Sequence, residues 1–111
     1  MQTKINRIFK AVADPTRREI FHLLVLGSAA LSITQISNHF DISRQAVTKH
    51  IKSLEDAGLV EIRSAGRERY CKANAVPLKE IQDWVSFYEK FWDNKLSSLV
   101  AHLENKSNKK S

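Results

Sequence analysis

Five side chains able to contact DNA bases or phosphates stand close together in the middle of the chain: Arg44, Gln45, Thr48, Lys49 and Lys52. The residues among and after them are apolar at helical spacing, which predicts a helix with an apolar back and these side chains in its first turns. The apolar positions are Ala46, Val47, Ile51 and Leu54. No acidic residue occurs between Ser43 and Ser53. A helix that presents long donors at its N-terminal end fits the major groove of DNA.

Gln45 and Thr48 are the two side chains that we expect to meet base edges. A glutamine can pair bidentately with adenine, and a threonine methyl group can contact the methyl group of thymine. Arg44 and Lys49 can bind either guanine or phosphate, and the sequence leaves both possibilities open.

Phosphate contacts are expected from this helix and from a hairpin that follows it. Ser43 and Lys52 can position the helix on the DNA backbone without reading sequence. Arg63 precedes the turn of the hairpin and Arg67 and Arg69 flank it, where they suit the backbone or a narrow minor groove. The predicted DNA-binding residues are therefore Ser43, Arg44, Gln45, Thr48, Lys49, Lys52, Arg63, Arg67 and Arg69.

Two helices joined by a tight turn must position these side chains. Ser32 or Thr34 can begin the first helix, which ends near Phe40. Ser43 is a good N-cap for the second helix, the predicted recognition helix, at about residues 43–57. The pattern is typical of a helix-turn-helix.

A hairpin is expected directly after the recognition helix. Gly58 suits the left-handed residue that ends the helix. Residues 59–73 then predict two strands joined by a turn at residues 64–66. Such a hairpin beside a helix-turn-helix is a wing.

Two further helices are expected before the helix-turn-helix. Residues 3–12 predict a short amphipathic helix, and Asp14 caps a helix over residues 15–26. The Asp-Pro pair at its start is explained by helix initiation alone. Arg17 and Arg18 can either contact phosphate or an acidic neighbour or serve only that helix, and both possibilities stay open.

The last predicted helix, at residues 77–104, is apolar on more than half of its circumference. A monomer with such a helix would leave a large aromatic patch in water, unless all of it packs internally. We expect this helix to pair with the helix at residues 3–12 across the two-fold axis of a homodimer. The predicted interface residues are Ile5, Ile8, Phe9, Trp84, Tyr88, Phe91, Trp92, Leu96 and Leu99.

Composition agrees with a nucleic-acid partner. The chain has 111 residues, a formal net charge of +6 and a pI near 9.7, which favours a polyanionic partner. We expect one domain over residues 1–104 and a basic, disordered tail at residues 105–111. The single cysteine, Cys71, excludes an internal disulfide and suits a reducing cytoplasm, and no apolar run predicts a membrane span.

Four segments in this order resemble the ArsR/SmtB-type winged-helix repressors, in the branch that lacks the metal-sensing cysteines. They are ADPTRREI (13–20), ISRQAVTKHIKSLEDAGLV (42–60), GRERY (66–70) and WVSFYEKFWDNKLSSLVAHLE (84–104). The resemblance implies a mainly α fold with a small β-hairpin that dimerises through its terminal helices. It also implies a homodimeric repressor, in many cases autoregulatory. Two recognition helices related by a two-fold axis enter successive major grooves about 34 Å apart, so the operator should be an inverted repeat.

The resemblance does not extend to the metal-sensing sites of the family. Ser32 and Thr34 stand where a Cys-x-Cys pair would be needed, and neither is a soft-metal ligand. Val85 and Asn105 interrupt the other ligand pattern, on the last helix. We therefore expect no metal and no cofactor, and the effector stays unknown. Cys71 is expected to be a half-buried small apolar residue. The alternative for the whole protein is a metal- or redox-responsive sensor with an atypical site.

Two other classes of protein fit the sequence less well. An enzyme is not expected, because the chain has no glycine-rich phosphate loop and no nucleophile with a base beside it. A winged-helix module that binds only proteins would favour neutral or acidic residues on the recognition face. The absence of acidic residues from that face disfavours this alternative.

Overall fold

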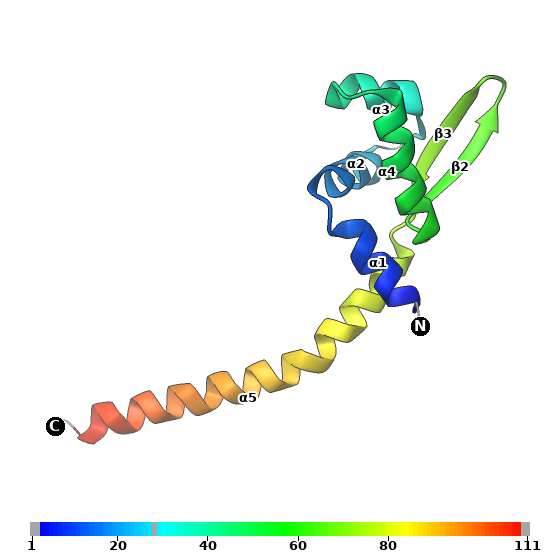
Figure 1. The fold of residues 1–111 in the computed structure, drawn as a ribbon. Helices are drawn as coiled ribbons and strands as arrows, with labels where there is room; N and C mark the ends of the chain where they lie inside the picture. The colour runs from blue at the N-terminus through cyan, green and yellow to red at the C-terminus, as the bar shows by residue number, and fades with distance from the viewer. Residues whose placement is uncertain (1–2, 28, 110–111) are drawn as a thin grey trace. The chain divides into compact units, whose positions relative to one another are not determined.

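The computed structural model describes residues 3–27 and 29–109, whose elements follow the order expected for a winged helix-turn-helix (Figure 1). By their internal contacts the residues form two units, one ending at Ile81 and one beginning at Gln82. The elements are α1 (Lys4–Val12), α2 (Pro15–Leu26), β1 (Leu31–Ser32), α3 (Ile33–Phe40), α4 (Arg44–Asp56), β2 (Val60–Ala65), β3 (Glu68–Ala73), the 3-10 helix η1 (Val76–Leu78) and α5 (Lys79–Lys109). The predicted fold class, mainly helical with a small hairpin, is confirmed.

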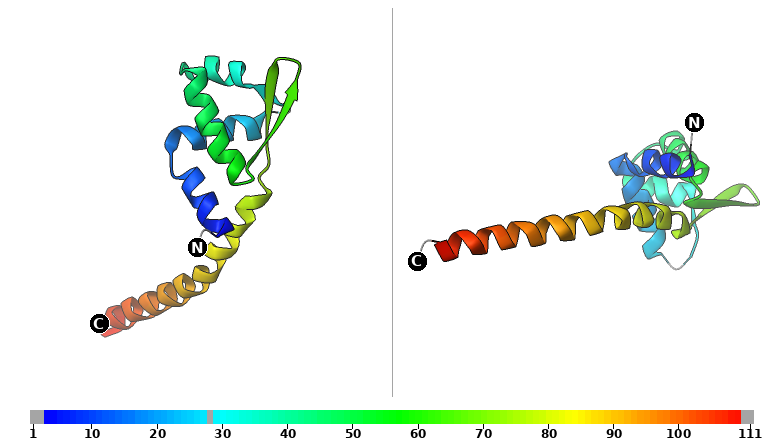
Figure 2. Two further views of the ribbon diagram at one scale, coloured as in Figure 1. Left: turned by 45° about the vertical axis from the view of Figure 1, so that its right-hand side comes forward. Right: turned by 90° about the horizontal axis from the view of Figure 1, so that it is seen from below.

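The hairpin belongs to a three-stranded antiparallel sheet, with the order β1-β3-β2. The third strand, β1, was not expected from the sequence. It places Leu31 opposite Cys71 and Ser32 opposite Tyr70, and so fastens the start of α3 to the wing. Two residues are too few to show the alternation of apolar and polar side chains that identifies a strand. Both views of Figure 2 show β2 and β3 extending beyond the neighbouring helices.

Side-chain caps define the two helices of the helix-turn-helix. Ser32, rather than Thr34, caps α3: its Oγ accepts from the backbone N–H of Gln35 at 3.1 Å, and Gln35 Oε1 accepts from the N–H of Ser32 at 2.8 Å. Ser43 caps α4 as predicted, accepting from the N–H of residue 46 at 3.1 Å. Gly58 has a φ of 77°, as expected for the residue that ends this helix.

Arg17 and Arg18 form hydrogen bonds with the C-terminal end of α1. Arg17 donates to the carbonyl oxygens of Lys10 and Ala11 at 2.9 and 2.7 Å, and Arg18 donates to that of Val12 at 2.6 Å. The carbonyl oxygen of Lys10 also accepts from the backbone N–H of Ala13 at 3.4 Å, and the two cations add side-chain partners at this end of α1, where they oppose the negative end of the helix dipole. Both guanidinium groups therefore join α1 to α2.

Asp14 holds the start of α2. Its Oδ1 accepts from the backbone N–H of Arg17 at 3.0 Å. This hydrogen bond, more than any nearby charge, lowers the pKa of the carboxyl group, so Asp14 stays ionised while it caps the helix.

The core of the first unit lies where its four α-helices meet the sheet. Its fully buried side chains include Ile8, Ile20, Ile36, Ile51, Leu54 and Leu59. Ile8 was predicted to lie at a dimer interface, and this prediction is wrong because the side chain is 0% exposed within the single chain. Ile5 and Phe9, on the same helix, are only partly buried.

The second unit consists of α5 alone, from Gln82 onward. The large apolar side chains of this segment are exposed, among them Trp84, Tyr88, Phe91, Trp92, Leu96 and Leu99. The helix runs to Lys109, so residues 105–109 are helical where a disordered tail was expected, and residues 110 and 111 lie outside the described part. No helix within residues 3–27 and 29–109 has the length and apolar character needed to cross a membrane.

Candidate nucleic-acid interface

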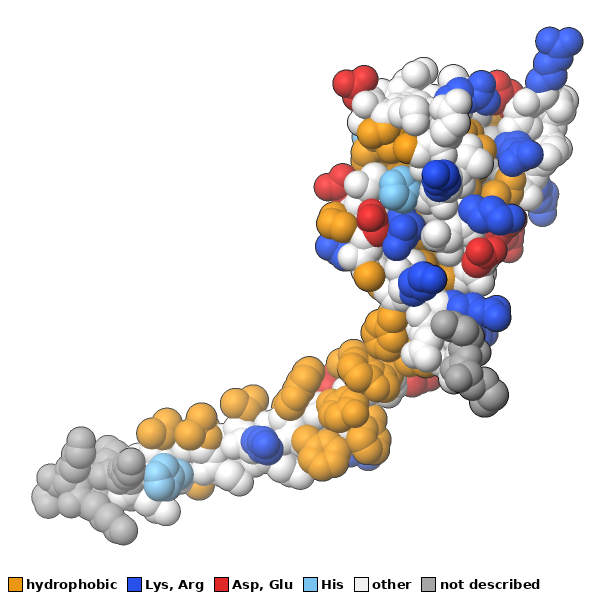
Figure 3. Space-filling view, viewed as in Figure 1, with side chains coloured by type: hydrophobic (Ala, Val, Ile, Leu, Met, Phe, Trp, Pro, Cys, Tyr) orange, Lys and Arg blue, Asp and Glu red, His pale blue; other side chains and the backbone are white. Residues whose placement is uncertain are grey.

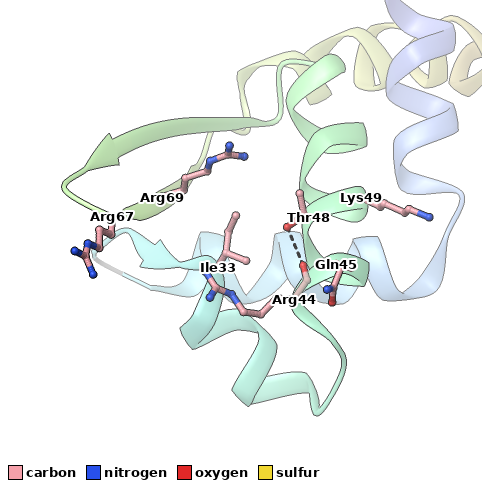
Figure 4. A pocket seen from close by; sticks show the side chains of 7 residues that line it. All are labelled: Ile33, Arg44, Gln45, Thr48, Lys49, Arg67 and Arg69. Carbon is pink, nitrogen blue, oxygen red and sulfur yellow. Dashed lines mark hydrogen bonds between the residues drawn. The ribbon is translucent and has the colours of Figure 1, made fainter.

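A hollow of about 610 Å³ lies between the first turns of α4 and the wing (Figure 4). The structure brings six of the predicted DNA-binding residues to this hollow, from two segments that are separate in the sequence. Its lining residues are Ile33, Arg44, Gln45, Thr48, Lys49, Arg67 and Arg69. Ile33 was not predicted as a site residue; as the first residue of α3 it is buried and supplies an apolar wall.

The side chain of Thr48 is already oriented by its own helix. Its Oγ1 donates to the carbonyl oxygen of Arg44, one turn earlier, at 2.8 Å (Figure 4). This bond uses the hydroxyl proton, so the methyl group and the oxygen lone pairs remain for a ligand. A methyl contact with thymine, as predicted, is compatible with this arrangement.

The wing supplies two cations to the hollow because of its strand register. In the β2–β3 ladder, Ile62 pairs with Cys71 and Ser64 pairs with Arg69. Cross-strand partners share a face, and alternate residues do too, so Arg69 lies on the face that also carries the buried Cys71. Arg67 follows the positive-φ Gly66 in the turn.

Arg63 does not join this group. It pairs with Tyr70, one residue from Arg69, and therefore lies on the opposite face of the hairpin. The turn also differs from expectation: β2 continues to Ala65, and the turn consists of Gly66 and Arg67. Gly66 has a φ of 63°, which suits the first position of a two-residue hairpin turn.

The hollow is strongly basic. Arg44, Arg67 and Arg69 line it, Lys49 lines it too although its ammonium group points away from the wing (Figure 4), and no acidic residue does. Ser43 and Lys52, the other two predicted contacts on this helix, are exposed but lie outside the lining. Figure 3 shows Lys and Arg side chains spread over the same face of the first unit. The surface can attract and hold a polyanion.

Cys71 lies beneath this face and is 0% exposed. Burial, with a smaller contribution from Glu55, raises the pKa of its thiol to about 11. The thiol is therefore neutral near pH 7, and a neutral buried thiol is a poor nucleophile. Among the residues that the structure describes, no group of three or more His, Cys, Asp or Glu side chains is placed to hold a metal ion.

Three comparisons with known proteins agree with this geometry. Residues 12–63 match a family model described as a helix-turn-helix domain. The chain is 32% identical to the transcriptional repressor SdpR of Bacillus subtilis over 92 residues, which are 83% of this chain and 100% of SdpR. It is 30% identical to the solved structure of an ArsR-like transcriptional regulator from Rhodococcus sp. RHA1, with a TM-score of 0.74 and coverage of 92% of each chain.

A more distant neighbour shares the fold. It is the solution structure of the homodimeric winged helix-turn-helix DNA-binding domain of Mb0332 from Mycobacterium bovis, a possible ArsR-family regulator. The identity is 22%, the TM-score is 0.62, and the match covers 78% of this chain and 79% of that one. Taken with the capped α3–α4 pair, the basic wing and the full-length match to SdpR, these findings show that the chain belongs to the ArsR family of winged helix-turn-helix transcriptional regulators, which bind DNA and are not enzymes.

Proposed function

We propose that this protein is a homodimeric transcriptional repressor that binds an inverted-repeat operator. The observation that carries the proposal is the basic hollow between α4 and the wing. Six of its seven lining residues are predicted DNA-binding residues, and none of the seven is acidic. Gln45 and Thr48 read base edges in the major groove, while Arg67 and Arg69 hold phosphate. Repression is proposed because SdpR, a relative over its whole length, is a transcriptional repressor.

The apolar surface of α5 supports the homodimer. Trp84, Phe91, Trp92, Leu96 and Leu99 are each about half exposed in the single chain. A contiguous apolar surface of this kind is rare on a soluble monomer and marks a protein contact. The distant neighbour Mb0332 is described as homodimeric. Pairing of α5 with α1 of a second copy across the two-fold axis of a homodimer covers this surface without any further protein.

The dimer determines the form of the operator. Two copies of α4 related by a two-fold axis present the same side chains to two major grooves, so the DNA sequence must repeat in inverted orientation. We propose autoregulation as well, which places one such operator upstream of the protein's own gene.

Footprinting of the full-length protein on that upstream region tests the proposal. We expect a protected inverted repeat whose half-sites are centred about one helical turn, or a multiple of it, apart. Protection should weaken steeply as salt increases, because bound phosphates release counterions. Binding to random and upstream duplexes with equal affinity, or protection of a single half-site, would contradict the proposed operator.

A further inference from the structure

A second basic surface lies outside the hollow, on α1. Lys4, Arg7 and Lys10 follow one another at three-residue spacing, all three are exposed, and α1 contains no acidic residue. Like charges at this spacing lie on one side of a helix and destabilise it. The three cations take no part in the core of the first unit, to which α1 contributes Ile8 and Ala11.

These cations line two hollows between α1 and the C-terminal half of α4. One, of about 530 Å³, is lined by Arg7, Lys10, Ala11, Ser53 and Asp56. The other, of about 410 Å³, is lined by Lys4, Arg7, Asp56, Ala57 and Gly58. Asp56 is the one carboxylate against three cations, so the surface keeps an excess of positive charge. Figure 3 shows these elements on a face where Lys and Arg predominate.

The recognition helix has the wing on one side and α1 on the other. α4 contacts both β2 and α1. In Figure 4, Arg67 and Arg69 lie on the wing side of α4, and Lys49 points from α4 away from the wing. Basic side chains therefore extend from both sides of α4, within one compact unit.

The major groove of B-DNA is about 12 Å wide and is bounded by one phosphate backbone on each side. A helix that enters it has a backbone to its left and another to its right. We propose that Lys4, Arg7 and Lys10 bind the phosphates of the strand on the α1 side, while the wing binds those on the other side. The inference rests on the proposed function, and it adds a phosphate-binding surface that holds DNA without reading its sequence.

The test compares two double variants of the full-length protein that lose the same net charge. Arg7→Gln/Lys10→Gln removes the proposed contacts. Lys72→Gln/Lys79→Gln is the matched control, because both lysines are exposed and Lys72 lies on the face of the sheet opposite Arg69. The probe is a random-sequence duplex of about three helical turns, and the measured quantity is the slope of log Kd against log salt concentration.

We expect the first variant to flatten this slope by about 3 to 4, since two contacts are lost in each of two subunits at about 0.9 per contact. The control should keep the wild-type slope. The charge-conserving variant Arg7→Lys/Lys10→Arg should restore it, and all variants should keep the wild-type sedimentation mass. Equal slopes for the first variant and the control overturn the inference, as does loss of slope in the charge-conserving variant. Salt-independent binding of the wild type would instead overturn the proposed function.

Discussion

The two units place their apolar side chains in opposite ways. In the first unit, large apolar residues such as Ile36 and Leu54 are fully buried, and the exposed face between α4 and the wing is basic. In the second unit, Trp92 is 55% exposed and Leu99 is 52% exposed. The first unit therefore has a core of its own and a basic exposed face that suits a polyanion, whereas the described side chains of the second unit form no core and leave an exposed apolar surface, the one proposed above for the dimer contact.

This difference separates two sources of stability. Burial within one chain stabilises the first unit at any protein concentration. In the proposed dimer, burial between two copies stabilises α5 only to the extent that the protein is associated, because association is a concentration-dependent equilibrium. Mutations in the two units should therefore differ in how their effects depend on concentration.

The largest effect is expected from Trp92→Glu. A buried interfacial tryptophan contributes on the order of 2–4 kcal/mol, and two-fold symmetry changes it twice, so the dimer should weaken by about 4–8 kcal/mol. Sedimentation at micromolar concentration should show half the wild-type mass. Lys90→Glu, at an exposed position on the side of the same helix away from the predicted interface residues, is the control and should leave the mass unchanged. A wild-type mass for Trp92→Glu would mean that α5 is not the interface.

A matched pair of leucines sharpens the comparison. Leu54→Ala, at a position 0% exposed, should cost about 2–5 kcal/mol of unfolding free energy because it leaves a cavity. Leu99→Ala should instead lower stability only where the protein is dimeric. Denaturant unfolding over a hundredfold range of protein concentration measures both. If Leu99→Ala lowers the free energy of unfolding by the same amount at every protein concentration, the proposed difference between the two units is wrong.

The buried thiol gives the first unit a pH dependence in alkali. Because the pKa of Cys71 is raised from 9.0 to about 11, the folded state binds a proton that the unfolded state has released between these values. The buried neutral thiol therefore contributes to the free energy of unfolding fully below pH 9, and this contribution is lost as pH rises through 11. The loss is about 2–3 kcal/mol, because each unit of pKa difference corresponds to about 1.36 kcal/mol. Urea unfolding at pH 8 and pH 11 should show this loss in the wild type.

Cys71→Ala provides the control for that loss. It should be less stable than the wild type at pH 8, because it leaves a small cavity, but should lose less stability on going to pH 11. The other alkaline titrations are common to both proteins and cancel in the difference. An identical alkaline loss in both would show that the thiol does not cause it.

Within the basic hollow, a residue that contacts bases and a residue that contacts phosphate should respond differently to mutation. Gln45→Ala should cost about 1–3 kcal/mol on the operator and little on random duplex DNA, because only a base contact is lost. Arg67→Ala should weaken binding to both and flatten the salt slope by about one counterion per subunit. Titrations on both duplexes at several salt concentrations decide this. The opposite pattern would make the wing the reader of sequence.

No effect is expected from zinc, cadmium, arsenite or copper ions. The positions of the family's ligand pairs hold Ser32, Thr34, Val85 and Asn105. Gel-shift assays with each ion at roughly the protein concentration should leave the DNA complex intact, since none of these side chains is a strong soft-metal ligand. Release of DNA that a chelator reverses would reveal a site of another composition.

Local signals in the sequence were sufficient for most of the helical elements. Ser43, Asp14 and Gly58 act at helix ends through hydrogen bonds or backbone conformations that involve only near neighbours. The spacing of apolar residues on α4 likewise determines which side of that helix faces the core. For these reasons the amino-acid sequence alone assigns the polar residues of its first turns to the exposed side, namely Arg44, Gln45, Thr48 and Lys49.

Contacts between distant residues decided the rest. Strand pairing, and not local sequence, placed Arg69 beside α4 and Arg63 on the opposite face, because a shift of one residue reverses the direction of a side chain. Packing of α1 against α2 and α4 buried Ile8 and left Lys4, Arg7 and Lys10 on the surface. The sequence thus determined which side chains this protein has for binding DNA, and the tertiary structure decided which of them share one surface.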